Sequence, residues 1–126
     1  DLDIVLCNYA QQSTVWKNTN GTFTVHQNFA SADSTSVTVE DVDKDGFADI
    51  LISRTNGQGV GLWKNNGKGV FFHSAQQLGL SSNSHDLGGR DLDGDGDIDV
   101  FIGNASPNAV WLNTTAKQSG GGGGCS

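Results

Sequence analysis

A twelve-residue segment occurs twice in this chain, and this internal repeat constrains the fold more than any other feature. Residues 41–52 read Asp-Val-Asp-Lys-Asp-Gly-Phe-Ala-Asp-Ile-Leu-Ile, and residues 91–102, 50 positions later, read Asp-Leu-Asp-Gly-Asp-Gly-Asp-Ile-Asp-Val-Phe-Ile. A truncated copy opens the chain, because residues 1–8 align with residues 97–104. Asp3, Asp49 and Asp99 are then equivalent, and the fold should consist of similar units placed side by side.

Each repeat predicts four short strands: one that enters the acidic segment, one that leaves it, one that contains a Trp, and a closing strand. The Trp residues, at matched positions 16, 63 and 111, are expected to fill the space between units. Asn-Gly pairs at 20–21, 56–57 and 66–67 are typical of hairpin turns. The strand ranges predicted around these features are 22–29, 36–40, 50–53, 70–75, 84–87 and 98–103.

Short strands, many turns and the absence of a helical period predict an all-β fold, built from β-propeller blades of four antiparallel strands. The chain would hold about two and a half blades by this alignment of its repeats. The expected organisation is a partial blade over 1–33 with the truncated loop, a complete blade over 34–80, a partial blade over 81–113, and a flexible Gly-rich tail or linker over 114–126.

Acidic residues are concentrated in the two repeated segments. The chain has 14 acidic and 7 basic residues, and the ranges 41–49 and 91–99 hold four and five of the acids. Such clusters repel themselves unless a cation lies in each. Calcium fits best, because it takes six to eight oxygen ligands, whereas zinc and copper prefer His or Cys and magnesium seldom uses an all-protein cage. The sequence therefore predicts two complete Ca²⁺ sites and one site truncated at the N-terminus.

The predicted ligands occupy loop positions 1, 3, 5, 7 and 9, with a backbone carbonyl at position 7. An EF-hand is rejected, because its position 12 needs a bidentate Glu, and Ile52 and Ile102 stand there within strand-like runs. The predicted metal residues are Asp41, Asp43, Asp45, Phe47 and Asp49 in the first loop, and Asp91, Asp93, Asp95, Asp97 and Asp99 in the second.

Several function classes are disfavoured by the composition. Seven scattered Lys and Arg residues make no basic stripe for nucleic acid, and no apolar run is long enough to insert in a membrane. The three histidines have no spacing that assembles a catalytic set, and the abundant aspartates are already assigned to metal loops, so no catalytic residue is predicted and the chain is not expected to be an enzyme.

Two further residue types carry predictions. Asn20, Asn104 and Asn113 begin N-glycosylation motifs, which are relevant in a eukaryotic secretory pathway. Cys7 lies in an apolar run and Cys125 in the tail, and this lone pair favours a buried free thiol plus a tail thiol over a disulfide.

The Asp-x-Asp-x-Asp-Gly-x-x-Asp loops, followed by aliphatic strands, resemble the FG-GAP and VCBS repeats of integrin α-subunit propellers, bacterial surface proteins and propeller lectins. Residues 101–107 look like a degenerate Gly-Ala-Pro segment, and residues 17–23 are similar to the Asn-rich turn of VCBS repeats. The resemblance covers roughly residues 1 to 113.

This resemblance implies a parent propeller of about seven blades, calcium loops on one face, a secreted or cell-surface location, and adhesion or recognition of a protein or glycan ligand. Expected partners also include the remaining blades of the same propeller or other copies of the chain. Two alternatives remain open: a structural spacer or assembly repeat of a large surface or matrix protein, and the propeller portion of a polysaccharide-active enzyme.

Overall fold

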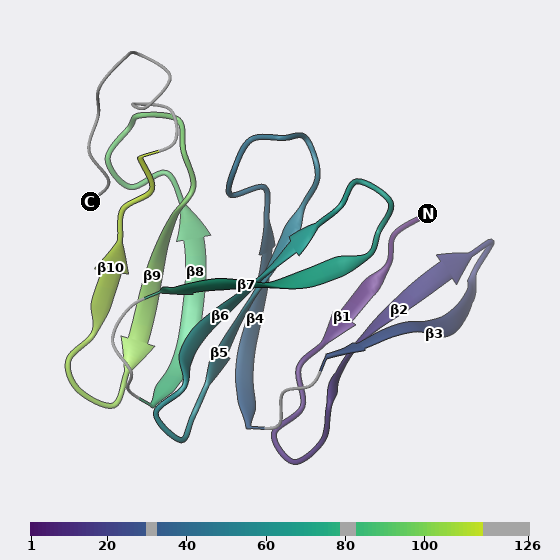
Figure 1. Ribbon diagram of the computed structural model, residues 1–126, viewed down its shortest axis with the longest axis horizontal. Coiled ribbons are helices and arrows are strands. Elements are labelled where there is room, and N and C mark those ends of the chain that lie inside the picture. Colours follow the sequence, from purple (N-terminus) through teal and green to yellow (C-terminus); the bar gives the residue numbers. More distant parts are fainter. Residues whose placement is uncertain (30–32, 79–82, 115–126) are drawn as a thin grey trace.

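The computed structural model describes residues 1–29, 33–78 and 83–114, and this part of the chain forms three antiparallel β-sheets without a helix (Figure 1). The sheets follow one another along the chain and fan out side by side (Figure 1). These sheets confirm the predicted all-β class. Within the described residues, no helix has the length and apolar character needed to cross a membrane.

Each sheet is a meander in chain order. The first sheet has the order β1-β2-β3, the second β4-β5-β6-β7 and the third β10-β9-β8. The strands are β1 (Ile4–Leu6), β2 (Ser13–Thr19), β3 (Thr22–Phe29), β4 (Ser34–Glu40), β5 (Asp49–Arg54), β6 (Gly59–Asn65), β7 (Phe71–Leu78), β8 (Ser84–Arg90), β9 (Asp99–Asn104) and β10 (Ala109–Trp111). The second sheet thus has the four-stranded form that the repeat predicts for a complete blade.

Each predicted strand range corresponds to a strand of the structure. The predicted and observed ranges differ mostly at the strand ends. β3 has the predicted bounds, β4 begins two residues before the predicted start at residue 36, and β7 continues to Leu78. β8 continues through the two glycines Gly88 and Gly89 to Arg90. These extensions occur because pairing with a neighbouring strand gives the backbone hydrogen-bond partners that a sequence pattern does not reveal.

The Asn20-Gly21 pair forms the tight turn between β2 and β3. Thr19 pairs with Thr22, so the loop has two residues, and both have positive φ angles of 52° and 86°. This is the backbone of a type I′ turn, which Asn-Gly favours because its twist matches that of the flanking strands. The sequence prediction of a hairpin here is confirmed.

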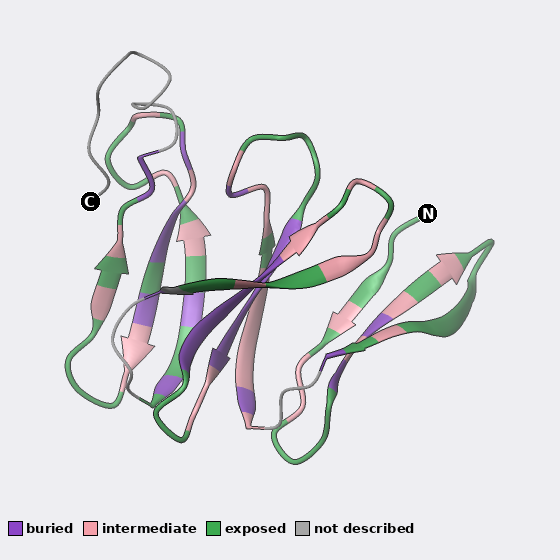
Figure 2. Cartoon of the chain, in the orientation of Figure 1, coloured by how far each residue is buried: buried purple, intermediate pink, exposed green. Residues whose placement is uncertain are grey.

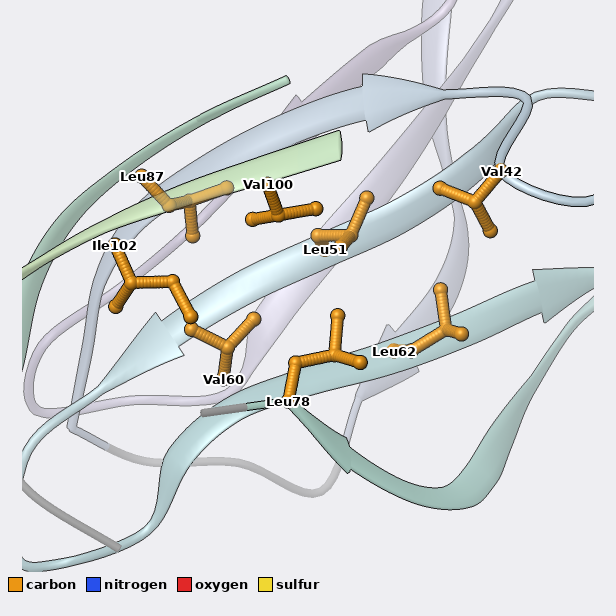
Figure 3. Close-up of a cluster of buried hydrophobic side chains, with 8 residues drawn as sticks. All are labelled: Val42, Leu51, Val60, Leu62, Leu78, Leu87, Val100 and Ile102. Carbon is orange, nitrogen blue, oxygen red and sulfur yellow. The ribbon is translucent and has the colours of Figure 1, made fainter. Parts of the chain in front are cut away.

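The middle sheet is buried on both of its faces. Ile50, Ile52 and Trp63 pack toward the first sheet, against Val15 and Phe29. The opposite face packs against the third sheet in a second cluster (Figure 3), which comprises Val42, Leu51, Val60, Leu62, Leu78, Leu87, Val100 and Ile102. The core therefore lies between sheets, as expected when each unit cannot bury its apolar face alone.

The Trp residues lie where the repeat predicts them, facing a neighbouring sheet in two of three cases. Trp63 is buried between the first two sheets. Trp111 is half-buried against the cluster between the second and third sheets. Trp16 is also half-buried, but it lies on the side of the first sheet away from the second.

The prediction of a buried thiol at Cys7 is wrong, because this free thiol is half-buried just after β1. Cys125 lies outside the described residues.

Candidate metal centre

The two complete aspartate loops each gather three carboxylates at one end of a sheet. The first loop joins β4 to β5, and the second joins β8 to β9. Carboxylate oxygens of Asp41, Asp43 and Asp49 all lie within 4.8 Å of one another. The equivalent Asp91, Asp93 and Asp99 meet the same limit, so the repeat in sequence is a repeat in geometry.

In both loops the first aspartate accepts two backbone hydrogen bonds from within the loop, and the glycine at position 6 gives one of them in each copy. The Asp41 carboxylate accepts the N–H groups of Asp45, at 3.2 Å, and Gly46, at 2.9 Å. In the second loop the Asp91 carboxylate accepts the N–H groups of Gly94, at 2.7 Å, and Gly96, at 2.9 Å. These bonds fold each loop around its first aspartate.

The sixth loop position requires glycine in both copies. Gly46 and Gly96 have φ angles of 89° and 90°, which residues with a Cβ rarely adopt. The fourth position also has positive φ, 58° at Lys44 and 80° at Gly94. The sharp bend inferred from the Gly residues is therefore present in both loops.

The ninth aspartate of each loop is the first residue of a strand and is fully buried. Asp49 accepts hydrogen bonds from the backbone of Asn65, at 2.9 Å, and Val42, at 3.3 Å. Asp99 accepts the corresponding bonds from the backbone of Asn113 and Leu92, at 2.8 and 2.7 Å.

The truncated copy retains part of this arrangement. Asp3 Oδ1 accepts the backbone N–H of Asn18 at 2.9 Å, as Asp49 does from Asn65. The sequence contains Trp-x-Asn three times, at 16–18, 63–65 and 111–113, and no bond from this Asn to the ninth aspartate was predicted. Its constant distance from the Trp was the signal that could have identified it as the partner of the ninth aspartate.

Negative charge inside the first loop is costly without a cation. Burial raises the pKa of the Asp49 carboxyl, and the nearby charges of Asp43 and Asp45 raise it further, against the two backbone hydrogen bonds. Burial alone would also raise the pKa of Asp43, but its ion pair with Lys64 lowers it overall. The same pair raises the pKa of Lys64.

The other predicted ligands lie in the loops but outside the two gathered sets. The carboxylate of Asp45 accepts the backbone N–H of Phe47 at 2.9 Å, and that of Asp95 accepts the N–H of Asp97 at 3.0 Å. The Asp97 side chain is fully buried, and its Oδ1 lies 3.1 Å from Nζ of Lys44 in the neighbouring loop. An ion pair therefore connects the two loops.

The three predicted glycosylation residues have different environments. Asn20 is exposed on the β2–β3 turn, and Asn104 is half-buried at the end of β9. Asn113 is only 3% exposed, and its Nδ2 atom donates to the carbonyl oxygen of Val42 at 2.5 Å. Nδ2 is the atom that would carry a glycan, so modification of Asn113 would require this buried bond to break.

The described residues also line a groove that reaches the first loop at Ala48 and a pocket on the second sheet. A groove of about 580 Å³ runs beside β1, with Asp3, Val15, Val37, Val39 and Phe71 among its walls. A smaller pocket of about 280 Å³ is lined by Arg54, Gln58, His73, Ala75 and Gln76.

The three histidines have different surroundings. The ring of His26 contacts the carbonyl of Gly69 at 3.0 Å, the ring of His73 lies tilted against that of Trp63 with centroids 4.7 Å apart, and His85 is exposed on β8.

Comparison with known proteins finds a family match in the N-terminal part of the chain. Residues 1–52 match the sequence model of the FG-GAP-like repeat. The matched span contains the first sheet, β4, the first aspartate loop and the start of β5. Among curated proteins, no match to this chain was found.

Proposed function

Because residues 1–52 of this chain are an FG-GAP-like repeat, we propose that the chain is a calcium-stabilised, extracellular β-propeller module that recognises a protein or carbohydrate ligand and is not a catalyst. The observation that carries the calcium part is the doubled carboxylate set. Three aspartate oxygens gather within 4.8 Å at the same positions of two loops, and one member of each set is fully buried.

The donor set fits calcium by its chemistry. All gathered ligands are carboxylate oxygens, and neither loop contains His or Cys. Asp41, Asp43 and Asp49 would hold the ion in the first loop, with Asp45, the carbonyl of Phe47 and water as further oxygen donors. Asp91, Asp93, Asp95, Asp97 and Asp99 would do the same in the second loop. Two ions would change the formal charge of −7 by +4, to −3.

A bound cation would stabilise the fold by joining strands. Asp49 begins β5, accepts a bond from the end of β6 at Asn65, and shares its loop with residues that follow β4. An ion held by Asp41, Asp43 and Asp49 therefore connects three strands of one sheet and neutralises a buried carboxylate. Binding to the folded state alone raises stability by mass action.

The location and the ligand are proposals that follow from the family. FG-GAP-like repeats are typical of extracellular proteins, where free calcium is abundant and loops of modest affinity, about 0.1 to 1 mM, are filled. A glycan array and a screen against extracellular-matrix proteins test ligand recognition. The absence of signal in both would contradict that part of the proposal, while polysaccharide cleavage by the purified chain would contradict the non-catalytic part.

Calcium titration of the metal-stripped chain by calorimetry, with thermal melts in parallel, tests the metal part. We expect two sites and a higher melting temperature with calcium. Asp49→Asn and Asp99→Asn should each remove one site. Asp33→Asn is the matched control, since Asp33 lies outside both loops and Asn tolerates its φ angle of 67°. Failure of calcium to bind, or an unchanged melting temperature, would contradict the proposal.

A further inference from the structure

Arg54 ends β5 with a positive charge that no acidic side chain neutralises. The ion pairs of the described residues join Lys44 to Asp97 and Lys64 to Asp43, and neither includes Arg54. All 14 acidic residues belong to the described part of the chain. Arg54 is half-buried, and burial lowers the pKa of its guanidinium without an acidic group to oppose it. A half-buried cation is therefore left without an acidic side chain as its counter-ion.

The hydrogen bonds of this guanidinium are also incomplete. Nη1 donates to Oε1 of Gln58 at 3.3 Å, and Nη2 donates to the carbonyl oxygen of the same residue at 3.1 Å. The Nε atom of Arg54 is buried, and none of the described residues accepts a hydrogen bond from it. A guanidinium has five N–H donors, and buried donors are normally satisfied. Arg54 therefore retains unused capacity to donate.

The connection that follows β5 does not require a charged residue at this position. Asn8 and Asn104 are the equivalents of Arg54 in the register of the three sheets. Each donates from its side-chain nitrogen to a carbonyl oxygen of the next connection, Asn8 to Gln12 at 2.8 Å and Asn104 to Pro107 at 2.9 Å. Arg54 makes the same kind of bond in the second sheet. Since a neutral Asn closes this connection in the other two sheets, the charge of Arg54 is additional to what the fold needs.

Arg54 lines the pocket of about 280 Å³ on the second sheet. The other walls are Gln58, in the β5–β6 turn, and His73, Ala75 and Gln76 on β7. β7 is the edge strand of this sheet and is largely exposed, whereas β5 and β6 are largely buried (Figure 2). The volume lies just below the range of about 300–1,000 Å³ that is usual for small-molecule sites. The pocket can therefore hold a group about the size of one sugar or one amino acid.

Aromatic rings hold the Arg54 side chain at this wall. Its Cζ atom lies 5.6 Å from the ring centroid of Trp63, a cation–π contact. The ring of His73 lies against the same indole. Gly61 leaves room for the arrangement, because a Cβ there would lie 2.6 Å from Trp63 and 3.1 Å from Cζ of Arg54. The cation is thus positioned in advance, which lowers the entropy cost of binding a ligand.

The electrostatic field at the pocket differs from that at the metal loops. Asp49 begins β5 and Arg54 ends it, so the two are separated by about 17 Å of strand, roughly two Debye lengths at physiological salt. Asp33 contacts the turn after Arg54, but its carboxylate accepts a hydrogen bond from Asn56 at 2.7 Å. Burial lowers the pKa of His73, and the charge of Arg54 lowers it further. The pocket therefore favours an anion, although the chain as a whole is acidic.

We propose that this pocket binds the carboxylate group of a small organic molecule, with the Arg54 guanidinium as its counter-ion. The planar fork of a guanidinium matches a carboxylate and can hold it with two parallel hydrogen bonds. One positive charge suits the single negative charge of a carboxylate better than the nearly double charge of a phosphate. Gln76 and His73 supply further polar groups in the same pocket. The site goes beyond the proposed function, because it uses neither calcium loop.

Titration of the isotope-labelled chain, followed by NMR in the presence of calcium, tests the proposal with two matched pairs of probes. D-glucuronate and D-glucose differ only in the carboxylate, as do N-acetylglycine and its neutral amide. We expect at least one of the acids to shift the signals of Arg54 and His73 with a Kd of about 1–10 mM, and neither neutral partner to do so. The acid that binds identifies the source as an acidic sugar or a peptide C-terminus. Absence of binding by both acids, or equal binding by a neutral partner, would overturn the proposal.

Substitutions at Arg54 test its role as the counter-ion. Arg54→Gln should abolish binding of the acid, and Arg54→Lys should weaken it at least about tenfold, because an ammonium keeps the charge but loses the fork. Arg90→Gln is the matched control, since Arg90 is exposed on β8. Calcium titration of each variant reports separately on the metal loops. Arg54→Gln that binds the acid as Arg90→Gln does would contradict the proposal.

The pKa of His73 gives a measurement that needs no substitution at Arg54. A bound carboxylate would add a negative charge to the pocket and should therefore raise the pKa of the His73 ring. Histidine ring signals, recorded by NMR across pH with and without the acid, measure the change, and His73→Phe assigns the signal. The pKa of the exposed His85 should stay unchanged. A pKa of His73 that does not move when the acid is bound would place the carboxylate elsewhere and overturn the proposal.

Discussion

Asn113 donates a hydrogen bond of 2.5 Å from its side-chain nitrogen to the carbonyl oxygen of Val42, and both residues are buried. The bond spans two sheets, because Val42 lies in the first aspartate loop and Asn113 follows β10. The backbone N–H of Asn113 also donates to Asp99 in the second loop, at 2.8 Å. One residue thus holds the two candidate metal loops together.

Replacing Asn113 by Ala should lower the free energy of unfolding by about 1–3 kcal/mol, because the buried carbonyl of Val42 loses its donor. Asn28→Ala is the control, since Asn28 is exposed on β3. Chemical denaturation of both variants measures the difference. Equal stability of the two variants would show that the bond contributes nothing.

Lys44 and Asp97 form the second link between the loops, with 3.1 Å between Nζ and Oδ1. Lys44→Ala should cost the metal-free chain about 1 kcal/mol, less than a fully buried pair because the Lys44 side chain is 46% exposed. The exposed Lys68 gives the control variant Lys68→Ala, which should remain within about 0.5 kcal/mol of the unmodified chain. Denaturant melts with a calcium chelator present decide the comparison.

Gly61 is required by the packing of Trp63. A Cβ at residue 61 would lie 2.6 Å from Cζ3 of Trp63, while a Cβ at Gly88 would meet nothing within 4 Å. Gly61→Ala should therefore destabilise the chain by about 1–3 kcal/mol through overpacking. Gly88→Ala should leave stability unchanged or raise it by up to about 1 kcal/mol. If thermal melts rank the two variants in the opposite order, the packing argument fails.

His73 should make stability depend on pH. Burial lowers its pKa from the ordinary value of 6.5, and the charge of Arg54 lowers it further. As pH falls below 6.5 the unfolded chain is protonated first, so the stability that His73 contributes above that pH is progressively lost.

His73→Phe keeps a ring against Trp63 without titrating and should flatten the decline in stability between about pH 7.5 and 5.5. Phe72→Leu, at an exposed neighbour that does not titrate, should decline as the unmodified chain does. Denaturant melts across this pH range provide the measurement. An unchanged slope in the His73 variant would contradict the assignment.

The sequence by itself determined the features that depend on local spacing. The repeat and the Asn-Gly turns identified the strands, because repeat spacing and the positive φ angles of tight turns are properties of residues close in sequence. Repetition of the Asp-x-Asp-x-Asp-Gly-x-x-Asp spacing identified both loops, since such a loop folds around its own first aspartate. The spacing therefore predicted Asp41, Asp43, Asp45, Phe47 and Asp49 as one group, of which the structure gathers the carboxylates of Asp41, Asp43 and Asp49.

Only the tertiary structure decided what depends on the packing of one sheet against another. The burial of Asn113, the pairing of Lys44 with Asp97 and the half-exposure of Cys7 all involve neighbours remote in sequence. Burial at equivalent positions is a further example: Ile4 and Ile50 are equivalent in the repeat, yet one is 40% exposed and the other is fully buried. A repeat assigns equal side chains to equal positions, but burial is set by which neighbouring sheet is present to cover them.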